Sequence, residues 1–308
     1  MKTAVVTGAN GFIGKRLVQR LLDRGATVYG VGFHFSENDF DTDHFFPIEL
    51  EFQHYLQMAE LIPEKEIDVF YHFAWGGGFE RDTLKDYKLQ LENAKAAGDA
   101  VMSAIQMKAK RFVYAGTVNE VETQQFINSF ENFRTRPTCI YAAAKLTSEL
   151  ICRTLAQEHQ LHYCAGLIPM IFGEGNYSKQ LVNIVLDNLL RGKEPKLIEG
   201  NNEYDLVYVE DVARAFQAIG ENGVDGKRYY IGHRELQTFR QWMEQIRDTV
   251  SPDINLRFGE YQDPLDLDYS LLDLDELYRD TGFECQECFS KRMREYAEWF
   301  KRNNCVGT

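Results

Sequence analysis

The stretch TAVVTGANGFIG, Thr3–Gly14, decides the fold of this chain. Its first five residues are β-branched or small and predict a buried strand, and the residues after it predict a helix over about 12–24. Gly8 and Gly11 between them permit a tight turn and the close approach of a ligand, and Gly14 lets the helix pack against the strand. Free backbone N–H groups and the positive end of a helix dipole meet at such a turn, so the stretch predicts a site for a pyrophosphate.

Four further runs of the same kind predict buried strands in the first half of the chain. They are TVYGVG at 27–32, DVFYHF at 68–73, RFVYAG at 111–116 and HYCAGLI at 162–168. Helical patterns at about 83–107 and 141–160 alternate with these strands. Such an order forms a parallel sheet with helices on both faces, whose ligands bind beyond the carboxyl ends of the strands. We therefore expect an α/β fold, a Rossmann-type doubly wound parallel sheet.

The pattern changes after about residue 170. A helical stretch is followed by YDLVYV, which resembles a strand, by a helix from Asp211, by a return strand RYYIG and by a helical C-terminal stretch that ends near Asn303. We expect a dinucleotide-binding domain at 1–170, with a return segment near 205–232. The remainder of 171–308 is expected to form a smaller, mostly helical substrate-binding lobe.

The composition restricts the partners of this protein. The 308 residues carry a net charge of −13, with a pI near 5.1, whereas binding to nucleic acid or to an anionic membrane needs a surplus of Lys and Arg. No apolar run approaches the roughly 20 residues that cross a bilayer, and the N-terminus does not resemble a signal peptide. We expect a cytoplasmic protein without nucleic-acid or membrane partners. Cys285 and Cys288 form one close pair, too little for a zinc site, and are expected to be ordinary thiols.

The stretch YAAAK, Tyr141–Lys145, places a phenol and an ammonium four positions apart. On a helix these two side chains lie on one face, and the alanines between them leave that face clear. A separate apolar stripe at Ala142, Leu146 and Leu150 is expected to bury the helix. A phenol with a pKa of about 10 is a poor base at neutral pH, and a nearby ammonium lowers that pKa, so the pair predicts a proton shuttle.

The pattern TGxxGxxG followed by YxxxK resembles the short-chain dehydrogenase/reductase superfamily, in particular its extended branch. Three further segments are similar to that branch. They are RFVYAGT, which ends at Thr117, YDLVYVEDVARA and DLDELYRDTGFE. The extended branch is dominated by enzymes that act on nucleotide-diphosphate sugars, and the resemblance alone supplies this substrate class.

The resemblance implies roles for three residues. Tyr141 is expected to donate or accept the proton at a sugar hydroxyl or ketone, most often at C4. Lys145 is expected to lower the pKa of Tyr141 and to bind the ribose of the cofactor, and Thr117 to hydrogen-bond the same sugar oxygen. The nicotinamide exchanges a hydride with the sugar carbon, while the protein supplies orientation and proton transfer.

The resemblance also implies a cofactor site. Backbone N–H groups of Phe12 and Ile13 are expected to meet the pyrophosphate, and Asn93 falls where relatives carry a structural or cofactor-site Asn. His72 is expected to be a satisfied strand residue. The other expected cofactor residues are Gly8, Gly11, Gly14, Glu49, Leu50, Ala74, Ile168 and Pro169.

One departure from the family pattern concerns the choice of cofactor. NAD-using relatives carry an Asp at the end of the second strand that binds both ribose hydroxyls, and this chain has Gly32 there. Without that carboxylate a 2′-phosphate is not repelled, and His34 and Ser36 are candidates to meet it, although no Arg stands nearby. The sequence favours NADP, with NAD as the alternative.

Two more departures concern the substrate. Relatives that dehydrate sugars place an Asp-Glu pair directly after the Thr, whereas Val118 and Asn119 follow Thr117 and Glu120 comes one position late, which disfavours elimination. Tyr204 replaces an Arg that contacts the substrate diphosphate in many relatives. The basic residues that are candidates to replace that Arg are Lys179, Arg191, Lys193 and Lys196, although each is better explained as a solvated surface charge.

Four hypotheses follow from these residues and the resemblance. The favoured one is a 4-keto-sugar reductase, and the alternative is a nucleotide-sugar 4-epimerase with tightly bound NAD(P). A sugar 4,6-dehydratase and a non-catalytic dinucleotide sensor are less favoured, because a sensor has little reason to retain all three catalytic residues. The helices near 86–107 and 141–158 resemble those by which relatives pair through a four-helix bundle, so a homodimer is expected.

Overall fold

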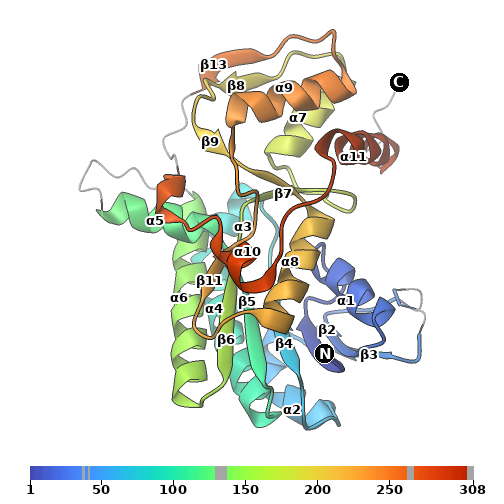
Figure 1. Ribbon diagram of the computed structural model, residues 1–308, viewed down its shortest axis with the longest axis vertical. Coiled ribbons are helices and arrows are strands. Elements are labelled where there is room, and N and C mark those ends of the chain that lie inside the picture. Colours follow the sequence, from blue (N-terminus) through green and yellow to red (C-terminus); the bar gives the residue numbers. More distant parts are fainter. Residues whose placement is uncertain (37–38, 41, 129–136, 262–266, 304–308) are drawn as a thin grey trace.

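The computed structural model describes residues 1–36, 39–40, 42–128, 137–261 and 267–303. A seven-stranded, wholly parallel sheet in the order β11-β6-β5-β4-β1-β2-β3 forms its centre (Figure 1). The strands are β1 (Thr3–Thr7), β2 (Thr27–Gly32), β3 (Phe45–Glu49), β4 (Val69–His72), β5 (Arg111–Thr117), β6 (His162–Ile168) and β11 (Arg228–Tyr230). The predicted α/β fold with a doubly wound parallel sheet is confirmed.

Strand β3 is absent from the sequence prediction. Its residues FFPIE contain Pro47, which lacks a backbone N–H and is tolerated only at the edge of a sheet. β3 is the edge strand next to β2, and four of its five residues are exposed or half-exposed. An edge strand of this kind lacks the continuous apolar run by which the buried strands were recognised.

Helices cover both faces of the sheet. On one face lie α1 (Gly14–Asp23), α8 (Val209–Asn222) and α10 (Glu276–Thr281). On the other face lie η1 (Phe52–Gln57), α2 (Met58–Leu61), α4 (Tyr87–Gln106) and α6 (Pro137–Glu158). α4 and α6 pack against each other along their lengths, and α1 packs against α8 (Figure 1). Each face has its own apolar core.

Two helices differ from the prediction. The expected helix at 83–107 is divided into α3 (Arg81–Lys85) and α4, because the side chain of Asp86 accepts the N–H groups of Lys88 and Leu89 and starts a new helix. Helix α5 (Val118–Asn128), directly after β5, was not predicted, since polar residues dominate its sequence VNEVETQQFIN.

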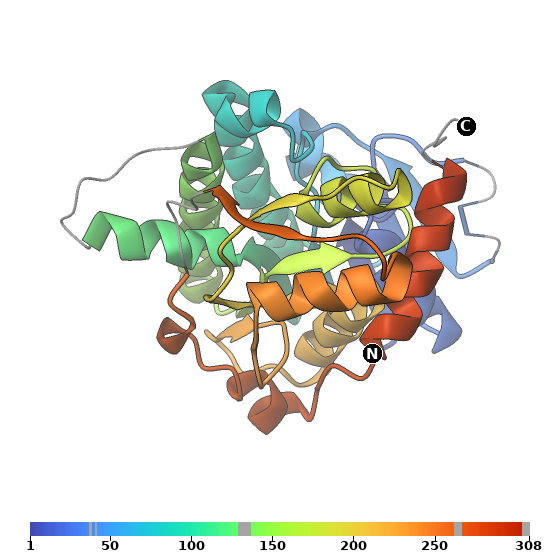
Figure 2. The ribbon, with the colours of Figure 1, turned by 90° about the horizontal axis from the view of Figure 1, so that it is seen from above.

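The second half of the chain adds a lobe above the carboxyl ends of the strands (Figures 1 and 2). Its helices are α7 (Leu181–Leu190), α9 (Phe239–Val250) and α11 (Phe289–Asn303). Short strand pairs accompany them: β7 (Met170–Phe172) with β10 (Leu206–Tyr208), β8 (Lys196–Ile198) with β13 (Arg257–Tyr261), and β9 (Glu203–Tyr204) with β12 (Gln237–Thr238). The core of this lobe contains the buried rings of Phe172, Trp242 and Tyr296.

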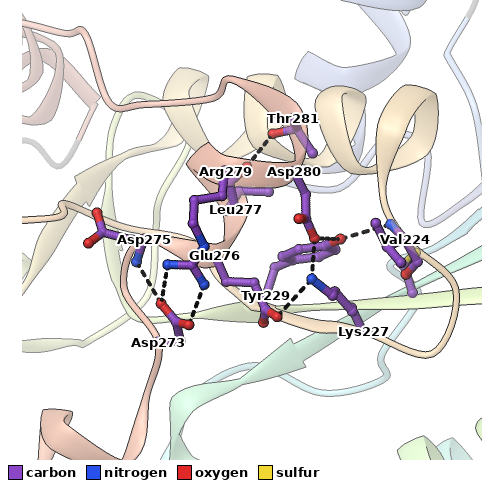
Figure 3. Close-up of polar contacts among 11 residues, drawn as sticks. Val224, Lys227, Tyr229, Asp273, Asp275, Glu276, Leu277, Arg279, Asp280 and Thr281 are labelled. Carbon is purple, nitrogen blue, oxygen red and sulfur yellow. Dashed lines mark hydrogen bonds and ion pairs between the residues drawn. The ribbon is translucent and has the colours of Figure 1, made fainter.

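Helix α10 is attached to the edge of the sheet by polar contacts (Figure 3). Lys227 Nζ lies 2.6 Å from Asp280 Oδ2 and 3.0 Å from Glu276 Oε1. The Tyr229 hydroxyl donates to Asp280 and accepts the backbone N–H of Val224, at 2.8 Å each. These bonds join α10 to the segment around β11. In the chain, the short η2 (Tyr269–Leu271) precedes α10, and the lobe helix α11 follows it.

No helix in the described ranges is long and apolar enough to cross a membrane.

Candidate active site

The glycine turn after β1 is tight and requires glycine at two positions. Gly8 has a φ of +68°, and a Cβ atom added there would lie 2.9 Å from the backbone N of Ala74. A Cβ on Gly14 would lie 2.0 Å from the Gly8 carbonyl oxygen, so only glycine lets α1 pack this closely. Gly11 donates its N–H to Gly8 O at 2.9 Å and closes the turn at the start of α1. The predicted roles of these glycines in the turn and in helix packing agree with this geometry, and the close approach of a ligand stays a prediction.

A cavity of about 850 Å³ opens from this turn along the carboxyl ends of the strands and under the second lobe. Most of the catalytic and cofactor-binding residues that were predicted from the sequence line this cavity. They are Gly8, Gly11, Phe12, Ile13, Gly14, Leu50, Ala74, Thr117, Tyr141, Lys145, Ile168 and Pro169. His34, Ser36, Glu49 and Asn93 are not among the residues that line it.

Thr117 and Tyr141 meet at the floor of the cavity. Thr117 is the last residue of β5, and Tyr141 lies in the first turns of α6; their side chains are almost fully buried. Burial raises the pKa of Tyr141, the charge of Glu120 raises it further, and a hydrogen bond with the Thr117 hydroxyl lowers it by less. The expectation that the pKa of Tyr141 is lowered is therefore wrong for this structure, because the sequence does not show how deeply the phenol is buried.

Lys145 lies one turn beyond Tyr141, as the spacing of YAAAK predicts. Its Nζ donates to the carbonyl oxygen of Ala115 on β5 at 2.9 Å and lies 3.8 Å from the centre of the Trp75 ring. Burial lowers the pKa of Lys145, and the charge of Glu120 opposes this change. The buried ammonium is thus in contact with a main-chain oxygen and an aromatic face.

The apolar stripe expected on the same helix is only partly correct. Ala142 is fully buried and Leu146 is half-buried, but Leu150 is 57% exposed. Leu150 therefore lies on the outer side of α6, away from the sheet. The spacing of apolar residues alone did not distinguish this outer face from the buried one.

Two aromatic residues that the sequence did not indicate line the cavity beside Tyr141. The rings of Trp75 and Phe79 meet the ring of Tyr141 edge to face, with centres 5.9 and 5.3 Å away. Trp75 is fixed by a hydrogen bond from its Nε1 to Gln90 Oε1 at 3.0 Å. Both aromatic residues belong to HFAWGGGF, which covers the last residue of β4 and the loop after it. The signal in the sequence that could have identified them was the presence of aromatic residues close to the end of a predicted strand.

Of the two carboxylates on α5, Glu122 lines the cavity and Glu120 does not. Glu120 is fully buried behind Thr117, where its Oε1 accepts the Thr117 N–H at 2.8 Å. Glu122 lines the cavity together with Asn119, whose Nδ2 donates to Glu122 Oε2 at 3.0 Å. The helical geometry of α5 decides which of these carboxylates faces the cavity, and that helix was not predicted.

The residues at the end of β2 form a separate exposed group. His34 Nδ1 lies 2.8 Å from Glu49 Oε1, which also accepts the Phe35 N–H at 2.9 Å. The N–H of Ser36 donates to Asp39. Gly32 lines the cavity and is paired in register with Glu49, so the carboxylate nearest to Gly32 in the sheet is on β3 and not on β2.

Asn93 and His72 have structural contacts. Asn93 Oδ1 accepts the Gly76 N–H at 2.7 Å and its Nδ2 donates to Gly76 O at 3.0 Å, which fixes the loop after β4. His72 is buried in β4, and its Nδ1 lies 2.8 Å from the Thr7 hydroxyl. Asn93 thus supports the wall of the cavity. His72 is a strand residue, as the sequence indicated, but the expectation that it is satisfied is only partly correct, because its Nε2 has no hydrogen-bond partner within the described residues.

The far end of the cavity lies under the second lobe. Tyr204 lines it with its ring against Phe239, at 5.2 Å between centres. Lys179 and Arg191 are exposed and face Glu80 and Asp187. Lys193 and Lys196 are also exposed and lie outside the lining. Among the described lining residues Lys145 is the only lysine or arginine.

A family model and known sequences match this chain over most of its length. The model of the NAD dependent epimerase/dehydratase family matches residues 4–232. The chain is 25% identical to the UDP-glucose 4-epimerase of Mycolicibacterium smegmatis, over 97% of this chain and 99% of that protein.

Solved structures show the same fold. The UDP-glucose 4-epimerase of Thermotoga maritima, solved with UDP-glucose, superposes with a TM-score of 0.78 at 19% identity, over 98% of this chain and 99% of that one. The Bordetella bronchiseptica enzyme WbmF, solved with NADH, superposes with a TM-score of 0.79 at 21% identity, over 99% and 93%.

Proposed function

This chain belongs to the NAD dependent epimerase/dehydratase family, and from that premise we propose that it is an NAD(P)-dependent reductase of a nucleotide-diphosphate 4-keto sugar. One observation carries the proposal: Thr117, Tyr141 and Lys145 meet at the floor of a cavity that also contains the glycine turn of a dinucleotide site. A side chain at Gly8 or Gly14 would collide with the main chain, so the tight turn that leads into a helix N-terminus, the usual site for a pyrophosphate, requires glycine at both positions.

The chain's own residues supply orientation and a proton. When bound, the nicotinamide cofactor supplies the hydride. Tyr141 donates its hydroxyl proton to the C4 oxygen, and the Thr117 hydroxyl orients that oxygen beside it. Because burial raises the pKa of Tyr141, the phenol keeps its proton at neutral pH, as a general acid requires. This favours reduction of a ketone over the opposite step, in which a phenolate removes the proton of a C4 hydroxyl.

Lys145 and the aromatic residues complete the proposed site. Lys145 faces the cavity and is the candidate to bind the ribose hydroxyls of the cofactor. Trp75 and Phe79 surround the Tyr141 ring, exclude water and leave only the cavity side of the phenol for a substrate. A dry site strengthens the interactions of Lys145 and Tyr141 with a bound substrate.

The second candidate is a nucleotide-sugar 4-epimerase. Two proteins that match nearly the whole chain are UDP-glucose 4-epimerases. The same three residues of this chain could serve either reaction. A 4,6-dehydratase is less favoured, because Val118 follows Thr117 and the carboxylate of Glu120 is buried away from the cavity. A cofactor sensor is less favoured because it does not require a buried phenol and ammonium at the floor of the cavity.

We also propose NADP as the cofactor, on the basis of Gly32. Its small size leaves no carboxylate on β2 to repel a 2′-phosphate, while His34 lies at the exposed end of the same loop. The carboxylate of Glu49 acts against this preference, because it places a negative charge 2.8 Å from His34, the candidate to meet the 2′-phosphate.

A homodimer is the proposed assembly. α4 and α6 pack closely at Gly98, where an added Cβ would lie 3.2 Å from Ile151. Both helices carry exposed apolar side chains, among them Tyr87 and Leu91 on α4 and Leu150 on α6. A second copy of this surface, related by a two-fold axis, would bury them in a four-helix bundle.

The function is tested with purified protein, NADPH or NADH, and a panel of nucleotide-diphosphate 4-keto sugars. A reductase consumes one reduced cofactor for each sugar reduced, whereas a 4-epimerase interconverts two nucleotide sugars without net consumption of cofactor.

Tyr141→Phe should lower kcat by about 10²–10⁴-fold and leave cofactor affinity nearly unchanged. Lys145→Met should lower both, and Tyr261→Phe, an exposed tyrosine on β13, is the matched control. Turnover by Tyr141→Phe at the parent rate would contradict the proposal.

A further inference from the structure

Arg16 lies in the first turn of α1, directly after the glycine turn. Its side chain is only 18% exposed, and it is not among the residues that line the cavity. The proposed reaction does not use it. A guanidinium is costly to bury unless its donors and its charge have partners, so the contacts of Arg16 indicate what it does.

One side of the guanidinium binds the glycine turn. Arg16 Nη1 donates to the carbonyl oxygen of Phe12 at 2.8 Å, and the guanidinium carbon lies 5.1 Å from the centre of the Phe12 ring. Phe12 lines the cavity, and its backbone N–H is one of the groups expected to meet the pyrophosphate. Phe12 and Ile13 also pack against the apolar core of the second lobe. Arg16 therefore holds the part of the turn that contacts both the cavity and the lobe.

The other side of the guanidinium binds the 173–180 segment, which connects β7 to α7. Arg16 Nη2 donates to the carbonyl oxygen of Glu174, and the Glu174 carboxylate accepts the Tyr208 hydroxyl at 2.8 Å. The segment passes close to the glycine turn, since a Cβ atom added to Gly175 would lie 3.8 Å from the Phe12 ring. The residues of the segment that line the cavity are Gly175, Asn176, Tyr177, Ser178 and Gln180.

A third contact balances the charge of Arg16. Its Nε lies 3.1 Å from Glu210 Oε1 on α8, the helix that packs beside α1 (Figure 1). A guanidinium is planar and presents its donors in fixed directions, whereas a lysine ammonium is a point charge on a flexible chain. The two Nη atoms of one rigid group therefore hold two carbonyl oxygens, from distant parts of the chain, at a fixed separation.

We propose that Arg16 is a positioning residue that links the glycine turn to the 173–180 segment, so that a ligand bound at the turn also stabilises the cavity wall under the second lobe. The inference deepens the proposed function, because it rests on the binding of a dinucleotide at that turn. The cofactor site and this wall are then coupled. By linkage, a ligand that stabilises one of them also favours binding at the other.

Amide hydrogen exchange, measured by mass spectrometry, tests this link without any ligand. The Asn176 N–H bonds Gly173 O at 3.2 Å and the Ser178 N–H bonds Asn176 Oδ1 at 3.0 Å, so the segment contains protected amides. Arg16→Met retains an unbranched side chain and removes the hydrogen bonds to both carbonyl oxygens. Exchange in the segment should then become at least about tenfold faster, as expected when a hydrogen bond from a charged group is lost.

Two further variants separate this link from a general effect of a lost arginine. Arg20→Met removes a second half-buried guanidinium of α1, one turn further on, whose Nε donates to Gln217 on α8 at 3.3 Å. This matched control should leave exchange in the segment unchanged. Arg16→Lys retains a charge beside Glu210 without the planar fork and should recover little of the protection. If Arg16→Met does not fold, Arg16→Lys is measured in its place, and its segment should exchange faster than that of the parent.

Saturating NADPH or NADH adds a readout that a merely structural role would not change. In the parent, the bound cofactor should slow exchange both at residues 8–14 and in the 173–180 segment. In Arg16→Met it should still slow exchange at 8–14 but no longer in the segment. Slower exchange in the segment of Arg16→Met would show that the cofactor protects the segment directly, which overturns the inference.

Other results would also overturn it. They are unchanged ligand-free exchange in Arg16→Met, an equal change in Arg20→Met, full recovery in Arg16→Lys, or a parent segment that a bound cofactor leaves unprotected. The proposed function fails by different results, the binding of neither cofactor or the absence of turnover with every nucleotide sugar. Because the first exchange measurement needs no ligand, it decides whether Arg16 links the two parts even if the proposed function fails.

Discussion

The Nζ atom of Lys145 lies 3.8 Å from the centre of the Trp75 ring, with the ammonium over the aromatic face. The indole is the aromatic ring that attracts a cation most strongly, and the attraction increases when water is excluded. Both side chains line the cavity, and Lys145 is almost fully buried. Trp75 therefore stabilises the charged form of Lys145 from the cavity side.

The first prediction concerns this contact. Trp75→Leu removes a cation–π interaction of about 2 kcal/mol, so the pKa of Lys145 should fall by on the order of one unit. Trp75→Phe retains an aromatic face and should have a smaller effect. The measurement is an NMR titration of protein labelled with ¹³C at the lysine ε-carbon, in which the Lys145 resonance is assigned by its loss in Lys145→Met. Trp299→Leu, in the second lobe, is the control. Equal titrations in Trp75→Leu and the parent would show that the ring contributes nothing to the charge of Lys145.

The second prediction concerns the choice between NADP and NAD. NADPH is expected to bind more tightly than NADH, because Gly32 presents no carboxylate to the 2′-phosphate. Gly32→Asp should reverse this order, but an added Cβ would lie 2.9 Å from Asn10 Oδ1 and 3.1 Å from Phe35, so the variant also changes the packing. Gly32→Ala is the steric control, and it should weaken both cofactors alike.

Fluorescence titration of NADPH and NADH measures these affinities. A further variant, Glu49→Gln, removes the carboxylate beside His34 and should strengthen NADPH binding more than NADH binding. Equal affinity of the parent for the two cofactors would remove the argument from Gly32.

The sequence was sufficient for the central fold because its signals are local. The apolar runs indicate which strands are buried, and the glycine spacing of TGANGFIG indicates where the chain turns. β3 was missed because Pro47 and its exposed neighbours interrupt such a run. α5 was missed because its sequence is mostly polar, although Glu120, Val121 and Thr123 are buried in it.

The site was predicted less completely, since it depends on the depth and direction of side chains. The spacing of Tyr141 and Lys145 gave their common face but not the burial that raises the pKa of Tyr141. Nothing in the linear sequence shows that Trp75 faces Lys145, because the two belong to segments that meet only in the fold. The distinction between Glu120 and Glu122 likewise required the direction of α5.

The third prediction concerns the assembly. Light scattering at micromolar concentration should show a dimer, and Leu91→Arg with Leu150→Arg should shift it toward a monomer, because both residues are more than half exposed on α4 and α6. Charges placed in a closed apolar interface remain unpaired, which costs several kcal/mol. Ile184→Arg, at an exposed position on α7 in the second lobe, is the matched control and should remain dimeric. A monomeric parent would contradict the proposed assembly.

The fourth prediction concerns stability at acid pH and rests on His72. This side chain is buried, with Nδ1 beside the Thr7 hydroxyl, and Nε2 has no hydrogen-bond partner within the described residues. Burial, with a contribution from the charge of Lys145, lowers the pKa of His72 to about 3, compared with about 6.5 for an exposed imidazole. The native state therefore holds His72 neutral over a pH range in which the unfolded chain binds a proton there.

The sign of the effect follows from this difference in proton binding. Stability from His72 is fully present above about pH 6.5 and is lost as the pH falls toward about 3, at up to about 1.4 kcal/mol for each pH unit. His72→Gln removes the titrating group, so its free energy of unfolding should depend less steeply on pH in this window, even if its stability at pH 7 is lower. Urea denaturation at about pH 7, 6, 5 and 4 measures the slope, and His159→Gln, an exposed histidine after α6, should retain the parent slope. If His72→Gln and the parent lose stability in parallel, the acid sensitivity comes from other groups and His72 is not held neutral by the fold.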